Sequence, residues 1–261
     1  MQSPHYAYCI LNTSTRPLPI DILMEIHDID RVLLLIKEIE EAIVTHGSQA
    51  HSLSHVCNIV SSKSKELLNS TDSLSPILRT ALVINWKESA MQSRYKRFKE
   101  LFPEVTDLQH LKKLIESINA FDFCTIYLNI KPNPTKPQAN PKYALLKTLT
   151  DGFLEYKDLI GASNEMEALR HWATRVNVKD LRNDFIGRRK GVGIGVVENI
   201  RLNLGYTVIK PDRHVIGVVQ HFLKLDIQPE NYLELSRALG IDARYLDCLL
   251  FEYGKLKNIS A

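Results

Sequence analysis

Apolar side chains recur every three or four residues through most of this sequence, a spacing that predicts amphipathic α-helices. The clearest case runs from Asp28 to Val44, where Ile, Leu and Val residues share one face and acidic residues occupy the other. Another helix is predicted to begin at Thr106, whose hydroxyl can cap it, and a third at Asn164. The same spacing predicts helices over 76–98, 178–186, 196–204 (ended by Gly205), 212–223, 229–239 (ended by Gly240) and 242–253 (ended by Gly254).

Alternating apolar and polar positions, which would indicate β-strands, are almost absent. The best such stretches are 123–130 and 206–209. Four prolines fall within 130–142, where they remove backbone donors and disfavour helix, so this segment is predicted to be a linker. We therefore expect an all-α protein.

Chain length, cysteine spacing and the distribution of apolar residues limit the classes of protein to which this chain can belong. The chain has 261 residues, enough for one large or two small domains, and its four cysteines are far apart, without the spacing of zinc or iron–sulfur ligands. The first 25 residues lack the pattern of a secretory signal, and no apolar run reaches the ~18 residues of a membrane span. We expect a cytoplasmic or nucleoid protein, or a nuclear one in a eukaryote, with reduced thiols.

The net charge of +3 does not by itself indicate a polyanionic partner, but the basic residues cluster. Arg188, Arg189 and Lys190 directly precede Gly191-Val192-Gly193-Ile194-Gly195, which lies between two predicted helices. We expect the glycines at 191 and 193 to adopt positive φ and to expose backbone N–H groups at the start of the second helix, where the helix dipole favours a phosphate.

Two other interpretations of these glycines were considered. A dinucleotide-binding fingerprint requires a preceding β-strand, whereas the preceding residues here are predicted to be helical and basic, and no Lys-Ser/Thr pair completes a phosphate-binding loop. A purely structural turn that closes a helical hairpin stays open as an alternative.

The order of these motifs resembles the helix-hairpin-helix DNA glycosylases, the superfamily that includes endonuclease III and the adenine and alkylbase glycosylases. Lys190-Gly191-Val192-Gly193 matches the family hairpin, and Lys210-Pro211-Asp212-Arg213-His214-Val215 matches the segment that carries its catalytic aspartate. The resemblance covers about 45 residues. It implies a two-lobed all-α fold with a cleft, in which 1–70 and 211–261 form one lobe with the aspartate at its edge. The second lobe, 71–210, would be a helical barrel containing the hairpin at 178–205.

The resemblance implies that Asp212 is the catalytic carboxylate, with a helix cap as the simpler alternative. An ionised carboxylate beside C1′ stabilises the cation-like sugar and orients water when an N-glycosidic bond breaks. Strand-cutting members carry a lysine at the position occupied here by Gly195, so lyase activity is not expected, although Lys190 and Lys210 lie close in sequence. Only Cys248 follows Asp212, so no iron–sulfur cluster is expected; the hairpin leaves room for a monovalent cation.

A base must leave the duplex to reach such a carboxylate, which requires a wedge and an aromatic pocket. A weaker similarity upstream, over Arg94–Pro103, places Asn85 and Trp86 in the wedge loop. Pocket candidates are Trp86, Trp172, Phe185 and Tyr206; for each ring, a place in the core is the competing interpretation. The basic cluster of Arg94, Lys96, Arg97 and Lys99 is expected to be a solvated helix face, with contact to phosphate as the alternative.

The sequence thus predicts a monomeric, monofunctional base-excision enzyme that acts on double-stranded DNA containing a damaged or modified base, with no membrane and no metal. Its expected backbone contacts are Arg188, Arg189, Lys190, Gly191, Val192, Gly193 and Gly195. One alternative is a non-catalytic DNA-binding or repair-scaffold protein that uses the hairpin for phosphate contact alone. A second is a helical protein-interaction domain without nucleic acid.

Overall fold

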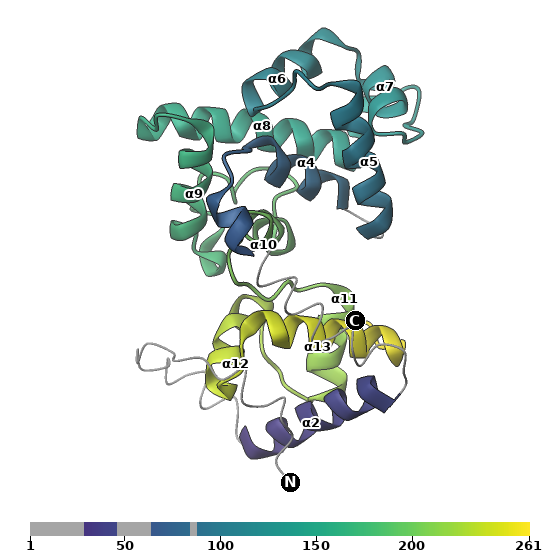
Figure 1. The fold of residues 1–261 in the computed structure, drawn as a ribbon, viewed down its shortest axis with the longest axis vertical. Coiled ribbons are helices and arrows are strands. Elements are labelled where there is room, and N and C mark those ends of the chain that lie inside the picture. Colours follow the sequence, from purple (N-terminus) through teal and green to yellow (C-terminus); the bar gives the residue numbers. More distant parts are fainter. Residues whose placement is uncertain (1–28, 46–63, 84–87) are drawn as a thin grey trace. The chain divides into compact units, whose positions relative to one another are not determined.

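The computed structural model describes residues 29–45, 64–83 and 88–261 (Figure 1). Every regular element within these ranges is helical, which confirms the predicted all-α class. The chain forms two compact units: unit 1 comprises residues 1–66 and 207–261, and unit 2 comprises residues 67–206. Among the described helices, none combines the length and the apolar character that crossing a bilayer demands.

Unit 2 is built around one hydrophobic core to which all of its long helices contribute. Its longest helix, α8, packs against α4, α6 and α9, and α4 also contacts α5 and α10. The elements of unit 2 are α4 (Leu74–Val83), α5 (Glu88–Leu101), α6 (Leu108–Ser117), α7 (Ala120–Asp122), a π-helix (Phe123–Tyr127), a 3-10 helix (Pro137–Ala139), α8 (Pro141–Ile160), α9 (Glu165–Arg175), a 3-10 helix (Val178–Asp180) and α10 (Ile194–Asn203).

Helix α8 is the largest element that the periodicity analysis missed. Asn140 caps it, its side-chain oxygen accepting hydrogen bonds from the N–H groups of Lys142 at 3.0 Å and Tyr143 at 3.4 Å. Pro141 occupies the first turn, where a missing N–H costs nothing. Gly161, with φ of +65°, ends the helix in the left-handed conformation. The predicted linker over 130–142 therefore ends in a helix start.

Several other predictions in unit 2 are wrong in detail. The stretch 76–98 forms two helices, α4 and α5, rather than one, and 84–87 lie outside the described residues. The cap of α6 is Asp107, not Thr106, since the Asp107 carboxylate accepts the His110 N–H at 2.8 Å. The stretch 123–130 contains a π-helix and 206–209 has no regular structure, so neither is a strand. Only Val178–Asp180 of the predicted 178–186 helix is helical, as a 3-10 turn.

Unit 1 has a separate hydrophobic core, in which α13 packs against α2, α11 and α12. Its described elements are α2 (Ile29–Thr45), α11 (Arg213–Gly217), a π-helix (Val218–Phe222) that continues α11, a 3-10 helix (Pro229–Asn231), α12 (Tyr232–Leu239) and α13 (Ala243–Leu256). The stripe between Asp28 and Val44 is confirmed, because Val32, Ile36, Ile39 and Ile43 are all buried.

Of the two glycines that are predicted to end helices in unit 1, only one does so. Gly240 ends α12 with φ of +64°, as predicted. Gly254 does not end α13, which continues to Leu256. Instead, Gly254 lies where α13 meets His214 of α11, and a Cβ at Gly254 would approach the His214 Cβ to 2.8 Å. The glycine is required for close helix packing rather than for a turn.

Candidate functional site

The basic glycine segment of unit 2 is organised by the Asp184 carboxylate. One of its oxygens accepts the Ile186 N–H at 2.9 Å and the Gly187 N–H at 2.6 Å, which folds the backbone into consecutive turns. The same oxygen accepts the indole N–H of Trp172 at 2.9 Å. These bonds replace the regular first helix that the sequence predicted, and they tie the turn to the buried ring of Trp172.

The turn then leads into α10 through two glycines with different backbone conformations. Gly191 has φ of +85°, the left-handed conformation that glycine adopts without penalty. The expectation of a positive φ at Gly193 is wrong: its φ of −118° and ψ of −178° are extended. Gly193 is instead the N-cap residue of α10, and a Cβ on Gly193 or Gly195 would meet no atom within 4 Å.

The start of α10 leaves backbone donors available. No side chain caps this helix. Within the described part of the chain, the N–H groups of Gly193, Ile194 and Gly195 donate no hydrogen bond. Such unsatisfied N–H groups carry the positive end of the helix dipole, so they can bind an anion such as a phosphate.

The three basic residues before the turn have different environments. Arg188 and Lys190 are exposed and can contact an anion at the helix start. Arg189 is half-buried, and its guanidinium pairs with Glu155 of α8 at 2.5 Å. Since this guanidinium also lies against Gly152, Arg189 joins the turn to α8, and its contact with a DNA phosphate stays a prediction.

Asp212 of unit 1 is the N-cap of α11. Its Oδ1 accepts hydrogen bonds from the His214 N–H at 2.8 Å and the Val215 N–H at 3.0 Å. The side chain is half-buried, and within the described residues its Oδ2 has no hydrogen-bond donor. Asp212 therefore does cap α11, as the alternative interpretation predicts, and the cap uses only one of the two carboxylate oxygens.

The histidine after this aspartate is held by packing. Its Nδ1 lies 2.8 Å from the backbone oxygen of Ile259, and its ring meets Phe251 edge-on, with centroids 5.9 Å apart. These contacts hold the His214 ring of α11 against Phe251 of α13 and the backbone of Ile259. We assign His214 a structural role.

A second carboxyl group near Asp212 was missed in the sequence. Asp247 of α13 accepts the backbone N–H of Lys210 at 2.9 Å, which fixes the segment just before Asp212. Burial of the carboxyl, together with the nearby Asp212 charge, raises the pKa of Asp247 to about 7, although the Lys210 N–H and the Lys210 and Arg244 charges oppose this. No motif marks Asp247, because it approaches Lys210 only through the packing of α13.

The proposed aromatic pocket residues do not form one group. Trp172 is 1% exposed and stacks edge-on against Phe153 in the unit 2 core, so the core interpretation holds for this ring. Phe185 lies beneath the guanidinium groups of Arg188 and Arg189, at 5.2 and 5.1 Å from its centroid. Tyr206 is half-buried at the edge of the same core. Asn85 and Trp86 lie outside the described residues.

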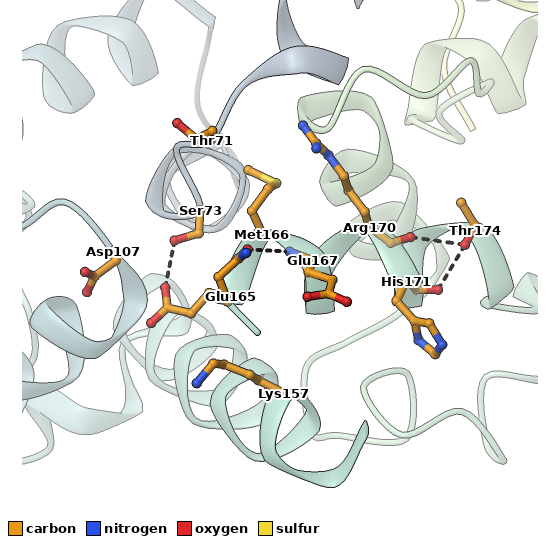
Figure 2. Close-up of a pocket in the computed structure, with 11 residues that line it drawn as sticks. Thr71, Ser73, Asp107, Lys157, Glu165, Met166, Glu167, Arg170, His171 and Thr174 are labelled. Carbon is orange, nitrogen blue, oxygen red and sulfur yellow. Dashed lines mark hydrogen bonds between the residues drawn. The ribbon is translucent and has the colours of Figure 1, made fainter. Parts of the chain in front are cut away.

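An open pocket of about 900 Å³ lies within unit 2 (Figure 2). The buried Glu165 on α9 lines this pocket next to Ser73, whose hydroxyl donates a hydrogen bond to the Glu165 carboxylate at 2.7 Å. The remaining lining residues are Thr71, Asp107, Lys157, Asn164, Met166, Glu167, Arg170, His171 and Thr174.

Most polar groups of this pocket are already engaged. Besides the Ser73 hydroxyl, Glu165 accepts the Leu108 N–H at 2.7 Å and the Gln109 N–H at 2.9 Å, so it holds the start of α6. Arg170 donates to the Ser70 carbonyl at 2.6 Å, and His171 Nδ1 is 2.9 Å from the Tyr156 hydroxyl. Since these bonds are internal, the Glu165 carboxylate is not available as a general base.

The candidate residues thus belong to two separate units: the glycine turn and α10 to unit 2, and Asp212 and Asp247 to unit 1. Within the described ranges, no group of three or more His, Cys, Asp and Glu side chains is arranged to hold a metal ion. Comparisons of this chain with family models, with curated proteins and with solved structures find no match.

Proposed function

We propose that this protein is a monofunctional DNA glycosylase of the helix-hairpin-helix type, with Asp212 as its catalytic residue. The observation that carries the proposal is the uncapped start of α10, where three free backbone N–H groups follow the left-handed Gly191. Exposed Arg188 and Lys190 flank it, so a DNA phosphate would meet both N–H dipoles and cationic side chains.

The chemical step follows from the environment of Asp212. The backbone N–H groups of His214 and Val215 bond to Oδ1, which leaves Oδ2 to face a cation-like sugar or a water molecule. The bond from C1′ to the base nitrogen breaks, the water oxygen bonds to C1′, and one water proton goes to the departing base. Because glycine stands at position 195, the products are a free base and an abasic site.

The family resemblance adds a fold to this proposal. In it, unit 1 and unit 2 correspond to the two lobes of the helix-hairpin-helix glycosylase fold. The partner is duplex DNA with a damaged or modified base, and the enzyme acts as a monomer in the cytoplasm or nucleoid, or in the nucleus of a eukaryote. No cofactor is required, although a monovalent cation at the hairpin is compatible with the proposal.

One observation favours the non-catalytic alternative, a DNA-binding or repair-scaffold protein. Oδ1 of Asp212 caps α11, which by itself accounts for an aspartate at this position. In that case the glycine turn would bind phosphate without any reaction. The two functions predict the same DNA binding and differ in base release.

Base release is tested with duplexes that each carry one alkylated, oxidised, deaminated or hypermodified base, followed by heating in alkali. We expect strand breaks at one class of lesion with the wild-type protein and none with Asp212→Asn. Asp226→Asn, which neutralises an exposed carboxylate of the same unit, is the matched control and should keep full activity. Equal cleavage by Asp212→Asn would remove Asp212 from the mechanism, and no breaks in any duplex would favour the scaffold alternative.

DNA binding is tested separately through its salt dependence. Replacing Arg188 and Lys190 together by Ala should weaken binding at least ~10-fold and lower the slope of log K against log salt by about two, since each phosphate contact contributes ~0.9. Lys113→Ala, which removes an exposed positive charge from α6, should change the affinity much less. An identical loss in both variants would show that binding follows the net charge rather than the glycine turn.

A further inference from the structure

The backbone before Asp212 is held by a single side chain of α13. Asp247 Oδ1 accepts the Lys210 N–H at 2.9 Å. Pro211 has no N–H to offer, and the Asp212 N–H turns back to the Lys210 carbonyl at 2.8 Å. The bond between Asp247 and Lys210 therefore fixes the segment that leads into Asp212, whose Oδ1 is held by the start of α11.

The same group is electrostatically coupled to Asp212. Part of residue 247 remains exposed, but its carboxyl is withdrawn from water, and this desolvation is the largest cause of its raised pKa, ahead of the Asp212 charge. Lys210 from the loop and Arg244 from α13 act in the opposite direction. Among the described residues, α2 and α12 add no charge that acts on this carboxyl. The Asp212 charge thus contributes to the raised pKa of Asp247.

We propose that Asp247 is the positioning residue of the catalytic loop, and that in its ionised form it supplies a second negative charge behind Asp212. The inference rests on the proposed function, because a second charge matters only if a cation-like sugar forms at Asp212. A negative charge that is fixed before the reaction stabilises such a cation without reorganisation. Asp247 acts through the loop and through its field, and it does not touch the substrate.

Two substitutions separate these contributions. Asp247→Asn keeps a side-chain oxygen that can accept the Lys210 N–H, but it removes the charge. Asp247→Ala removes both the charge and the hydrogen bond. If the charge contributes as proposed, Asp247→Asn already slows base release; if only the anchor matters, Asp247→Asn retains the wild-type rate and Asp247→Ala alone is impaired.

The first experiment measures single-turnover base release on the duplex identified by the lesion panel, from about pH 5 to about pH 9. The wild-type rate should rise through an apparent pKa near that of Asp247, about 7, as this carboxyl ionises. Asp247→Asn should lack this rise and be ~10-fold slower above it, with unchanged DNA affinity. Asp226→Asn should match the wild type. A rise that persists in Asp247→Asn would overturn the proposal.

The second experiment requires no substrate. In protein labelled with ¹³C at the aspartate carboxyls, Asp247 should titrate with a midpoint of about 7, and the Lys210 amide signal should move with it. The Asp212 carboxyl signal should show an inflection at the same pH, and Asp247→Asn should abolish it while Asp226→Asn keeps it. An Asp212 signal without this inflection would overturn the coupling even if base release occurs. The expected titration with no base release from any duplex would instead refute the proposed function and the catalytic role of the pair.

Discussion

Glu165 provides the most demanding test of how unit 2 is held together. Its two carboxylate oxygens accept three hydrogen bonds, from the Ser73 hydroxyl and from the N–H groups of Leu108 and Gln109. The residue is only 9% exposed, so water cannot readily replace its carboxylate as the acceptor for these donors. Through this one side chain, α9 joins the start of α4 to the start of α6.

The cost of removing the Glu165 carboxylate follows from the donors left behind. Hydrogen bonds to a charged acceptor contribute about 1.5–3 kcal/mol each, and an unsatisfied buried donor costs about 1–3 kcal/mol. The contributions are not additive within one network, so we expect Glu165→Ala to lower the free energy of unfolding by roughly 4 kcal/mol. Glu165→Gln keeps one acceptor oxygen and should cost about half as much.

Urea unfolding monitored by tryptophan fluorescence reports on this effect, because Trp172 is buried in the core of unit 2. Glu116→Gln on α6 is the control: Glu116 is exposed and its pair with Lys112 spans 4.0 Å, so its loss should change stability by less than about 0.5 kcal/mol. A loss below about 1 kcal/mol in Glu165→Ala would refute the argument that this carboxylate fastens α4 and α6.

Three further substitutions test other parts of the fold. Since the pKa of Asp247 is about 7 in the folded chain and near 3.8 when unfolded, its favourable contribution is complete below about pH 4 and lost as the pH rises through 7. In urea unfolding, the wild-type free energy of unfolding should fall by up to about 4 kcal/mol over this pH interval, and Asp247→Asn should not show this fall. Gly254→Ala should cost about 1–3 kcal/mol in thermal unfolding, because its Cβ would press to 3.0 Å from the His214 carbonyl oxygen. Gly191→Ala, at φ of +85°, should cost about 1 kcal/mol and weaken DNA binding in a fluorescence anisotropy titration. An Asp247→Asn curve parallel to the wild type, or Ala variants as stable as the wild type, would contradict these expectations.

The elements that sequence periodicity predicted correctly are those in which one helix face decides the structure. In α2 the buried positions repeat every three or four residues, and in α9 the Asn164 side chain accepts the Glu167 N–H at 2.9 Å as the capping pattern requires. Both signals are local, so they survive without knowledge of the rest of the chain.

The failures have physical causes that are visible in particular contacts. The stretch 123–130 is rich in β-branched and aromatic residues, which favour a strand locally. The chain instead forms a π-helix there, and Tyr127 packs edge-on against Phe102, with centroids 4.4 Å apart, in a tertiary contact that local propensity does not reveal. Four prolines concealed the start of α8, although Asn140 followed by Pro141 is itself a helix-start signal. Asp247 could not be found from sequence, because its partner Lys210 is 37 positions away and the contact depends on the packing of unit 1.

Asp212 combines a structural and a proposed chemical role because the two roles use different oxygen atoms. Oδ1 accepts hydrogen bonds from two N–H groups of α11, and among the described residues Oδ2 accepts none. A cap made by Ser or Thr would satisfy the same N–H groups without placing a negative charge there. Asn also preserves the cap through its side-chain oxygen, so Asp212→Asn separates the charge from the fold. A variant that remains as stable as the wild type but releases no base would therefore place the chemistry on the charge itself.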